Sequence, residues 1–229
     1  MQAKMSKQRA KELTELSKKM AYVLRHGASK EGLRMDKAGY IDLHDILAHK
    51  MFKGVNRSDI ADVVKSDKKG RYEVLHEDNK EYIRAVQGHS VEGLHHDQIM
   101  KQIFNAEDLQ GKTIVHGSYM QYWHIIRSTG LKAMSRNHMH FAVGYKGDDN
   151  VKSGMRNDCD LFIEMDVELA LKQGLPVYIS SNNVVLTPGV NKTLSPIFFR
   201  AVYQKTKAGM ELIYCNAHLD KIKYDHCYK

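Results

Sequence analysis

Arginine and histidine side chains recur in short glycine-containing segments of this 229-residue chain. Arg25 and His26 stand in "LRHG" and Arg71 in "KKGRYEV", whereas Arg136 stands in "SRNHMHF", which has no glycine. We find no paired carboxylates suited to acid–base catalysis, no P-loop, no nucleophile elbow and no GxGxxG fingerprint. Arginine grips phosphate with paired donors because its guanidinium is planar and always charged. The sequence therefore predicts a site for anions, above all phosphates.

Further polar segments accompany these cations. "IVHGS" places His116, Gly117 and Ser118 at the end of an expected strand, where glycine lets a ligand approach the backbone. In "SGMRND", Gly154 precedes Arg156 in an expected loop, and "SSNNVVLTPG" is a polar cluster that leads into an apolar strand. Each segment also has a plain structural interpretation, as a strand-end turn or a solvated loop.

The histidine pair in "SRNHMHF" raises the question of a metal. Strand alternation puts His138 and His140 on one face and Met139 on the other. Zinc would need a third ligand, and no other histidine stands at a recognisable ligand spacing. A polar face lining a cleft is favoured, and no metal is expected. The three cysteines lack CxxC spacing, which indicates free thiols in a reducing compartment.

The positive charge is concentrated in the first third of the chain. Residues 1–71 hold 17 Lys and Arg against 9 Asp and Glu, a net of +8, whereas residues 72–229 hold 18 of each. A one-sided basic region is the footprint of a polyanion such as nucleic acid, although a solvated surface is the alternative. With no apolar run of membrane-spanning length and no signal-like segment, the protein is expected inside the cell, in the cytoplasm or nucleus, without membrane contact.

Three helices and a hairpin are predicted to hold the first group of cations. "LTELSKKMAYVLRHG" predicts a helix with one apolar face that ends at Gly27. "DKAGYIDLHDILAH" predicts a short strand and a second helix, and "NRSDIADVVKSD" a third with Ser58 as its N-cap. "RYEVL" and "EYIRAV", joined by "HEDNK", are typical of a hairpin. This order favours a winged-helix domain.

Strands dominate the second part, so an α+β fold is predicted. "YMQYWHIIRSTG" and "VELALKQG" predict its helices. A linker is expected near residues 90–107, with domains at 1–95 and 96–229 and order beginning near residue 10. The expected strands are "KTIVHG", "HMHFAV", "LFIEMDV", "PVYISS", "NVVLT", "SPIFFRAV" and "MELIYC".

Eight segments also resemble, in order and spacing, the NAD-dependent RNA 2′-phosphotransferase family, whose members finish tRNA splicing in fungi and plants. The resemblance spans roughly residues 13–200 and implies a winged-helix RNA-binding lobe followed by an ADP-ribosyltransferase-like lobe that binds NAD+. The segments are "LSKKMAYVLRHG", "DKAGYIDLHDIL", "KGRYEV", "IRAVQGHS", "IVHGS", "MSRNHMHFA", "SGMR" and "SSNNVVLTPG".

The resemblance implies a two-step reaction. An internal RNA 2′-phosphate attacks C1″ of NAD+ and expels nicotinamide, and ribose O2″ of the 2′-phospho-ADP-ribosylated RNA then attacks the phosphorus. The products are 2′-OH RNA and ADP-ribose 1″,2″-cyclic phosphate. The missing acids fit this chemistry, because the nucleophile is already an anion and nicotinamide leaves neutral. NAD+ is then a co-substrate, RNA with an internal 2′-phosphate such as spliced tRNA is the partner, and a monomer is expected.

The resemblance assigns catalysis to Arg25, His26, Arg71 and Arg136. The arginines would clamp the 2′-phosphate, and His26 would either donate a hydrogen bond to it or act as the acid of the second step. No role is assigned to His138. The NAD+ pocket would comprise His116, Gly117, Ser118, His140, Ser153, Gly154, Arg156, Ser181 and Asn182.

Two departures from the family pattern leave these groups in place. "HGS" replaces the usual "HGT", and Asn183 replaces a glycine, where asparagine tolerates positive φ well enough to keep the turn. Val184-Val185 stand where many wider relatives carry a catalytic glutamate, which argues against ordinary protein ADP-ribosylation. Two alternatives remain open: an ADP-ribosyltransferase acting on nucleic-acid phosphates, and a non-catalytic RNA-binding module.

Overall fold

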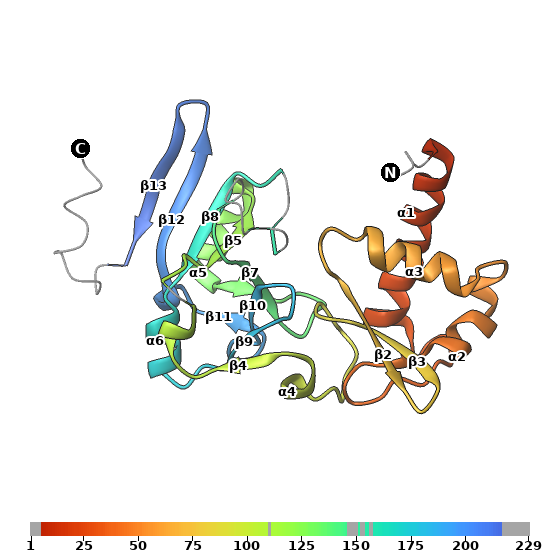
Figure 1. Ribbon diagram of the computed structural model, residues 1–229. Coiled ribbons are helices and arrows are strands. Elements are labelled where there is room, and N and C mark those ends of the chain that lie inside the picture. Colours follow the sequence, from red (N-terminus) through yellow and green to blue (C-terminus); the bar gives the residue numbers. More distant parts are fainter. Residues whose placement is uncertain (1–5, 110, 146–150, 152–153, 156–157, 217–229) are drawn as a thin grey trace. The chain divides into compact units, whose positions relative to one another are not determined.

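Helices and strands are mixed along the chain, which confirms an α+β fold (Figure 1). The computed structural model describes residues 6–109, 111–145, 151, 154–155 and 158–216. By its contacts the chain divides into two compact units. The N-terminal unit comprises Met1–Lys101 and Ser180–Asn182, and the C-terminal unit comprises Gln102–Ile179 and Asn183–Lys229.

The N-terminal unit contains the expected order of helices followed by a hairpin. Its first helix begins at Lys7, ahead of residue 10, because the Ser6 side chain caps it by accepting a hydrogen bond from the Arg9 amide. The hairpin turns tightly through Asp78 and Asn79, both with positive φ, as a two-residue hairpin turn requires. The elements are α1 (Lys7–Tyr22), η1 (Val23–Gly27), β1 (Ile41–Asp42), α2 (Leu43–Ala48), η2 (Lys50–Phe52), α3 (Arg57–Ser66), β2 (Tyr72–Glu77), β3 (Lys80–Ala85) and α4 (His96–Ile99).

Helix α3 begins two residues earlier than the sequence predicts, so Ser58 is not its N-cap. Asn56 is the cap: its side-chain oxygen accepts from the Asp59 amide at 3.1 Å. The Asp59 carboxylate accepts in return from the Asn56 amide at 2.9 Å, which completes a capping box. Ser58 instead donates its hydroxyl to the Asn56 side chain. The carboxylate at the third helical position decides the start, because it satisfies a second backbone donor.

A three-stranded antiparallel sheet of order β1-β3-β2 packs with these helices around one core. Met20 and Leu24 come from α1 and η1, Ile60 from α3 and Ile83 from β3, and all four are buried together with Phe52. This core fixes the end of α1 and the start of β2, where the predicted cations stand.

The C-terminal unit is built on an eight-stranded sheet of order β13-β12-β8-β5-β7-β10-β9-β4. Its core lies between this sheet and helices α5 and α6, and it includes Trp123, Phe141 and Phe199. The elements are β4 (Lys101–Ile103), η3 (Ala106–Leu109), β5 (Val115–Ser118), η4 (Met120–Tyr122), α5 (Trp123–Thr129), β6 (Leu131–Lys132), β7 (Met139–Ala142), β8 (Leu161–Met165), α6 (Val167–Lys172), β9 (Val177–Ile179), β10 (Val184–Thr187), β11 (Thr193–Leu194), η5 (Pro196–Phe198), β12 (Phe199–Thr206) and β13 (Gly209–Cys215).

The segment expected to be a linker, residues 90–107, contains the boundary between the two units, at Lys101 and Gln102, and it also holds regular structure. It contains α4, β4 and the start of η3, and Ile99, Met100 and Ile103 are buried. Its apolar residues are too few and too short in run to show a period, which is why the sequence pattern missed them.

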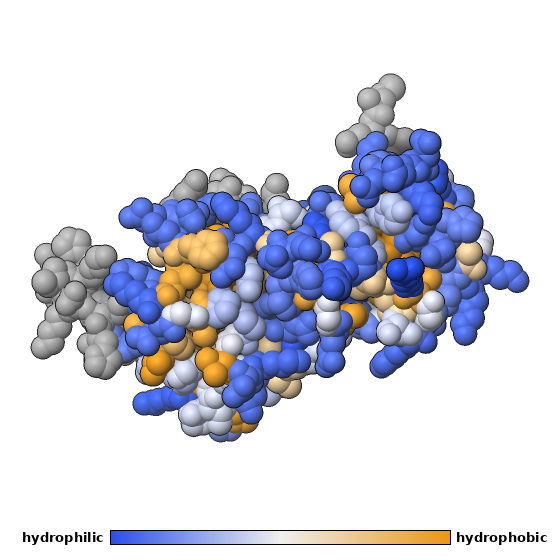
Figure 2. Space-filling model, turned by 90° about the horizontal axis from the view of Figure 1, so that it is seen from below, coloured by the Kyte–Doolittle hydropathy of each residue, from blue (hydrophilic) through white to orange (hydrophobic). Residues whose placement is uncertain are grey.

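The hydropathy of the surface varies from one region to another. Figure 2 shows one face, hydrophilic over much of its area, with apolar side chains gathered over part of the C-terminal unit. Large apolar side chains exposed in that unit include Phe104, Met134 and Val190. None of the helices in the described ranges is both long and apolar enough to cross a membrane.

Candidate functional site

The turn that carries Arg25 and His26 is a π-helical turn, η1, at the end of α1. Such turns are rare and are found often at functional sites. Val23 and Leu24 are buried in the core, so the turn is firmly held, while Arg25 is half-buried and His26 is exposed. Gly27 closes the turn, and a Cβ there would lie 2.5 Å from the Tyr22 ring, which would have to move aside.

The strand-end segment after β3 packs against this turn. The Ser90 amide donates to the Arg25 carbonyl oxygen at 2.9 Å, and the Ser90 hydroxyl lies 2.9 Å from Nδ1 of His26. The Arg25 side chain passes over Gly88, where an added Cβ would be 3.5 Å from Cδ, Nε and Cζ. Gly88 adopts φ +90°, a left-handed conformation that suits glycine. Arg25 and His26 are thus both located by residues that follow β3.

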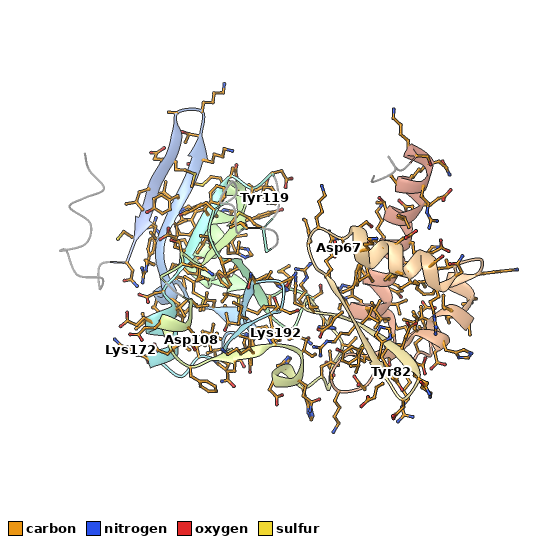
Figure 3. The ribbon with its side chains drawn as sticks, in the orientation of Figure 1. Asp67, Tyr82, Asp108, Tyr119, Lys172 and Lys192 are labelled. Atoms are coloured by element: carbon orange, nitrogen blue, oxygen red, sulfur yellow. The ribbon has the colours of Figure 1, made fainter. Side chains whose placement is uncertain are left out.

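Arg71 is positioned by the carboxylate of Asp67, which was not predicted from the sequence. Asp67 ends α3, and its Oδ1 pairs with Nη1 of Arg71 at 2.6 Å while Oδ2 accepts from the Arg71 amide at 2.5 Å. The Asp67 side chain is 5% exposed and that of Arg71 is 32% exposed. Figure 3 marks Asp67 at the loop between α3 and β2. The pair holds the guanidinium at the mouth of the hairpin.

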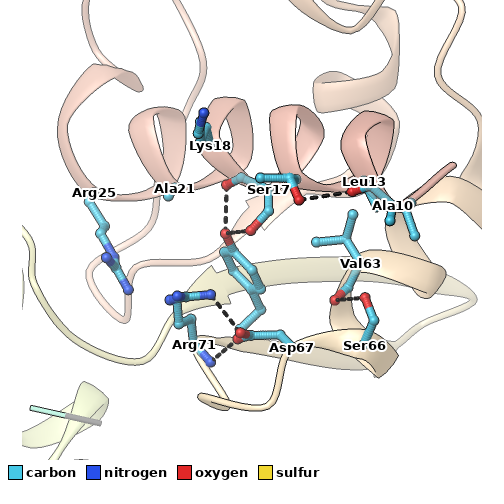
Figure 4. A pocket seen from close by; sticks show the side chains of 12 residues that line it. Ala10, Leu13, Ser17, Lys18, Ala21, Arg25, Val63, Ser66, Asp67 and Arg71 are labelled. Carbon is cyan, nitrogen blue, oxygen red and sulfur yellow. Dashed lines mark hydrogen bonds and ion pairs between the residues drawn. The ribbon is translucent and has the colours of Figure 1, made fainter. Parts of the chain in front are cut away.

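A groove between α1 and the α3–β2 loop brings Arg25 and Arg71 together (Figure 4). Its volume is about 540 Å³. The Tyr72 hydroxyl lies inside it, 2.7 Å from the Ser17 carbonyl oxygen, and burial raises the pKa of that phenol, so it stays protonated and donates. The full lining is Ala10, Leu13, Thr14, Ser17, Lys18, Ala21, Arg25, Val63, Ser66, Asp67, Arg71 and Tyr72.

In the C-terminal unit, His116, Gly117 and Ser118 lie on β5, near the middle of the sheet. Nδ1 of His116 is 2.8 Å from the His140 carbonyl oxygen. A carbonyl only accepts, so Nδ1 carries the hydrogen. Met155 and Cys159 pack closely over Gly117. A Cβ added there would lie 2.5 Å from a Met155 side-chain atom and 2.7 Å from the Cys159 sulfur, which favours glycine.

The "HMHF" histidines lie at the start of β7. Met139 and Phe141 belong to the core, so His140 points to the opposite face of the strand, as the alternation predicts. Both His138 and His140 are buried, at 5% and 7% exposure. The His138 ring packs edge-on against Tyr178 with centroids 5.8 Å apart, which is a packing role.

Arg136 lies in the loop between β6 and β7 and is exposed. Its amide donates to the Ala133 carbonyl oxygen at 3.2 Å, closing a turn in which Met134 has φ +59°. The loop is therefore shaped by its own backbone bonds, directly before the strand that carries His140.

The loop residues of the predicted NAD+ pocket are only partly described. Ser153 and Arg156 lie outside the described residues. Gly154 has φ +96°, and a Cβ there would be 3.0 Å from the backbone of Ala142 on β7. This close approach explains the glycine and places it beside the strand of His140.

The "SSNNVV" segment follows β9. Nδ2 of Asn182 donates to the Lys69 carbonyl oxygen at 2.8 Å, and Oδ1 of Asn182 accepts from Ser180 at 2.7 Å. Asn183 adopts φ +59°, which confirms that asparagine keeps this turn. Val184 and Val185, at the start of β10, are both fully buried. They are the pair that stands where many wider relatives carry a catalytic glutamate.

The predicted catalytic residues are divided between the two units. Arg25, His26 and Arg71 belong to the N-terminal unit, whereas Arg136 belongs to the C-terminal unit. Asp67 and Ser90, which contact Arg71 and His26, were not predicted from the sequence. Asp67 carried a usable signal, since aspartate four residues before arginine in a turn-forming "SDKKGR" is a candidate partner.

The candidate residues of the two units are arginine, histidine and hydroxyl side chains on an α+β frame, and such side chains suit a class of protein that handles phosphate groups. Within the ranges that the structure describes, no group of three or more His, Cys, Asp or Glu side chains is placed to hold a metal ion. The model of the family described as RNA 2′-phosphotransferase, Tpt1 / KptA family, matches residues 11–189. The chain belongs to this family of transferases.

Named relatives agree with that assignment. A zebrafish (Danio rerio) protein named tRNA 2′-phosphotransferase 1 is 42% identical over 187 residues, covering 80% of this chain and 82% of that protein. The human protein of the same name is 36% identical, covering 83% of this chain and 75% of its own. The tRNA 2′-phosphotransferase of Saccharomyces cerevisiae is 35% identical, covering 80% of this chain and 82% of that protein.

Proposed function

We propose that this protein removes an internal 2′-phosphate from RNA, such as spliced tRNA, by transferring it to NAD+. In the first step a phosphate oxygen bonds to C1″ and the bond from C1″ to nicotinamide breaks, its electron pair neutralising the pyridinium. In the second step O2″ bonds to phosphorus and the bond from phosphorus to RNA O2′ breaks. O2″ loses its proton to solvent and O2′ gains one from the protein. The products are 2′-OH RNA, nicotinamide and ADP-ribose 1″,2″-cyclic phosphate.

The observation that carries the RNA side of this proposal is the pair of arginines at one groove. Arg25 and Arg71 line the same cavity, whose volume of about 540 Å³ lies in the range of small-ligand sites. Two guanidinium groups there offer paired donors to a phosphate dianion. The N-terminal unit also contains the basic first third of the chain, which favours a polyanionic substrate.

The donor set of the C-terminal unit fits NAD+ on chemical grounds. With Nδ1 of His116 donating to the His140 carbonyl, Nε2 of the neutral ring is an acceptor, suited to a ribose hydroxyl or an amide N–H. The Ser118 hydroxyl, on the same strand, both donates and accepts. The remaining proposed contacts come from His140 and Gly154 of the same unit, from Ser181 and Asn182 of the N-terminal unit, and from Ser153 and Arg156.

Catalysis in this proposal is positioning and electrostatics. Arg25, Arg71 and Arg136 hold the phosphate and stabilise the charge that is redistributed around phosphorus in the second step. His26 supplies the proton that O2′ takes when it leaves. A metal ion has no part in either step.

The test is an RNA that carries one internal 2′-phosphate, incubated with the purified protein and NAD+. We expect nicotinamide, ADP-ribose 1″,2″-cyclic phosphate and RNA with a free 2′-hydroxyl. RNA recovered unchanged would leave only the binding-module alternative. Stable ADP-ribosylated RNA without cyclic phosphate would favour the alternative of a transferase acting on nucleic-acid phosphates.

A further inference from the structure

We propose that Ser90 is a positioning residue that sets the orientation and the proton placement of the His26 ring. This inference rests on the proposed function, in which His26 gives a proton to the leaving RNA oxygen. Ser90 belongs to the "QGHS" segment, to which the proposed reaction assigns no role. Its hydroxyl oxygen lies 2.9 Å from Nδ1 of His26.

The backbone around Ser90 is anchored to both arginines of the groove. The Val86 amide donates to the Arg71 carbonyl oxygen at 3.0 Å, and the Ser90 amide donates to the Arg25 carbonyl oxygen at 2.9 Å. Residues 86–90 therefore join the start of β2 to the π turn. The Ser90 hydroxyl is delivered to His26 by a segment that is fixed at both ends.

Gly88 lets this segment lie flat against the Arg25 side chain. An added Cβ would stand 3.5 Å from three atoms of that side chain, an ordinary contact, and the positive φ at Gly88 favours glycine there. The three-residue stretch from Gly88 to Ser90 thus runs beside the Arg25 side chain, bonds the Arg25 carbonyl oxygen through the Ser90 amide, and reaches His26 through the Ser90 hydroxyl. A role in placing both groups follows from these contacts.

A serine suits both protonation states of the imidazole. When the ring is an imidazolium, Nδ1–H donates to the Ser90 oxygen, and Nε2–H is the donor that we assign to RNA O2′. After that proton has moved, the neutral ring keeps its bond to Ser90, because a hydroxyl donates as readily as it accepts. A hydrogen bond at one ring nitrogen therefore decides which nitrogen serves the reaction.

The experiment compares Ser90→Ala, Ser90→Thr and His26→Ala on the 2′-phosphorylated RNA. We expect Ser90→Ala to lower kcat about tenfold, as expected for one hydrogen bond to a charged group, with the KM for NAD+ unchanged. Ser90→Thr keeps a hydroxyl and is expected to restore most of the rate. In the His26→Ala background, Ser90→Ala is expected to have no further effect, since its partner is gone.

Ser29→Ala is the matched control, because Ser29 is an exposed serine two residues beyond the same π turn. It should leave kcat at the wild-type value. Wild-type turnover by Ser90→Ala, or an equal loss in the His26→Ala background, would overturn the role of Ser90 while leaving the proposed function intact. Thermal unfolding of each variant separates a folding defect from a catalytic one, and a Thr variant that folds but stays slow also counts against the proposal. A wild-type protein without turnover would instead reject the proposed function.

Discussion

The side chain of Asp67 fixes the position of the Arg71 guanidinium. A buried carboxylate takes one guanidinium nitrogen and the backbone amide of Arg71, so the cation is held in place before any ligand arrives. Arginine offers five N–H donors, so one bond to Asp67 leaves it able to grip a phosphate as well. Preorganisation of this kind reduces the cost of binding, because the side chain has already lost its freedom.

Replacement of Asp67 by asparagine should weaken that arrangement. Asp67→Asn keeps the size of the side chain but removes its charge, so we expect kcat/KM for RNA to fall about tenfold as Arg71 loses its ion pair. Steady-state kinetics at saturating NAD+ measure this. The control is Asp62→Asn, an exposed carboxylate of α3 that pairs with Arg9 rather than Arg71. Equal losses in both variants would show that a general charge effect, not the positioning of Arg71, is responsible.

Arg136 offers a second test at the level of one residue. If Arg136 stabilises charge at phosphorus, Arg136→Ala should slow the second step by about a hundredfold or more, as for loss of one preorganised donor. RNA bearing ADP-ribose should then accumulate, which gel electrophoresis detects. Arg127→Ala, an exposed arginine of α5 in the same unit, provides the comparison. Wild-type turnover of Arg136→Ala would mean that the phosphate site lies elsewhere.

At the scale of elements, the two candidate N-caps of α3, Asn56 and Ser58, make different hydrogen bonds. Asn56 accepts from the Asp59 amide, and Asp59 returns the bond, whereas Ser58 only donates to Asn56. Asn56→Ala should therefore cost about 1 kcal/mol of the free energy of unfolding. Ser58→Ala should cost clearly less, because the capping box remains. Urea unfolding of the two variants checks the order, and the reverse order would restore Ser58 as the cap.

The sequence predicted elements well where a local pattern was strong. The first helix, the hairpin and the buried strands of the C-terminal unit all carry a clear period, and the turn at Asn183 was predicted from the tolerance of asparagine for positive φ. The segment expected to be a linker contains the boundary between the two units, at Lys101 and Gln102, but the short elements α4 and β4 within it were not predicted, because they show no period. The predicted N-cap of α3 was wrong too, because Asn56 and Ser58 are both good cap residues and only the capping box with Asp59 decides between them.

The candidate site was harder to predict than the elements. The resemblance to a family supplied the positions of Arg25, His26, Arg71 and Arg136, but not the groups that hold them. Ser90 reaches His26 across 64 positions of sequence, and no single-sequence pattern reports a contact of that kind. Such partners become visible only when the fold brings β3 beside the end of α1.

At the scale of the whole molecule, charge should govern how RNA binds. Residues 1–71 have an excess of eight positive charges over negative ones, while the rest is balanced. If three arginines neutralise phosphate, the logarithm of the RNA association constant should fall with the logarithm of salt concentration at a slope of about −2 or steeper. Fluorescence anisotropy over a KCl series measures it. An affinity that does not change with salt would exclude an electrostatic contribution from this region.

Metal independence is a second expectation at the scale of the whole protein. The proposed chemistry uses no Lewis acid, so prolonged treatment with EDTA should leave kcat unchanged on the 2′-phosphorylated RNA. The measurement compares initial rates before dialysis, after it, and after addition of Zn²⁺ or Mg²⁺. A loss of activity that one of these ions restores would contradict the proposal.

The strand order of the large sheet also constrains how the chain is made. Strand β5 lies between β8 and β7, and β4, first of the eight in the chain, pairs at the edge with β9. A ribosome therefore releases β4 and β5 before any of their neighbours in the sheet exist. Because such non-local pairings close slowly, and because β10 joins β9 and β4 to β7, the C-terminal sheet should form only after synthesis has passed β10, whereas the local hairpin β2–β3 can form as soon as it emerges.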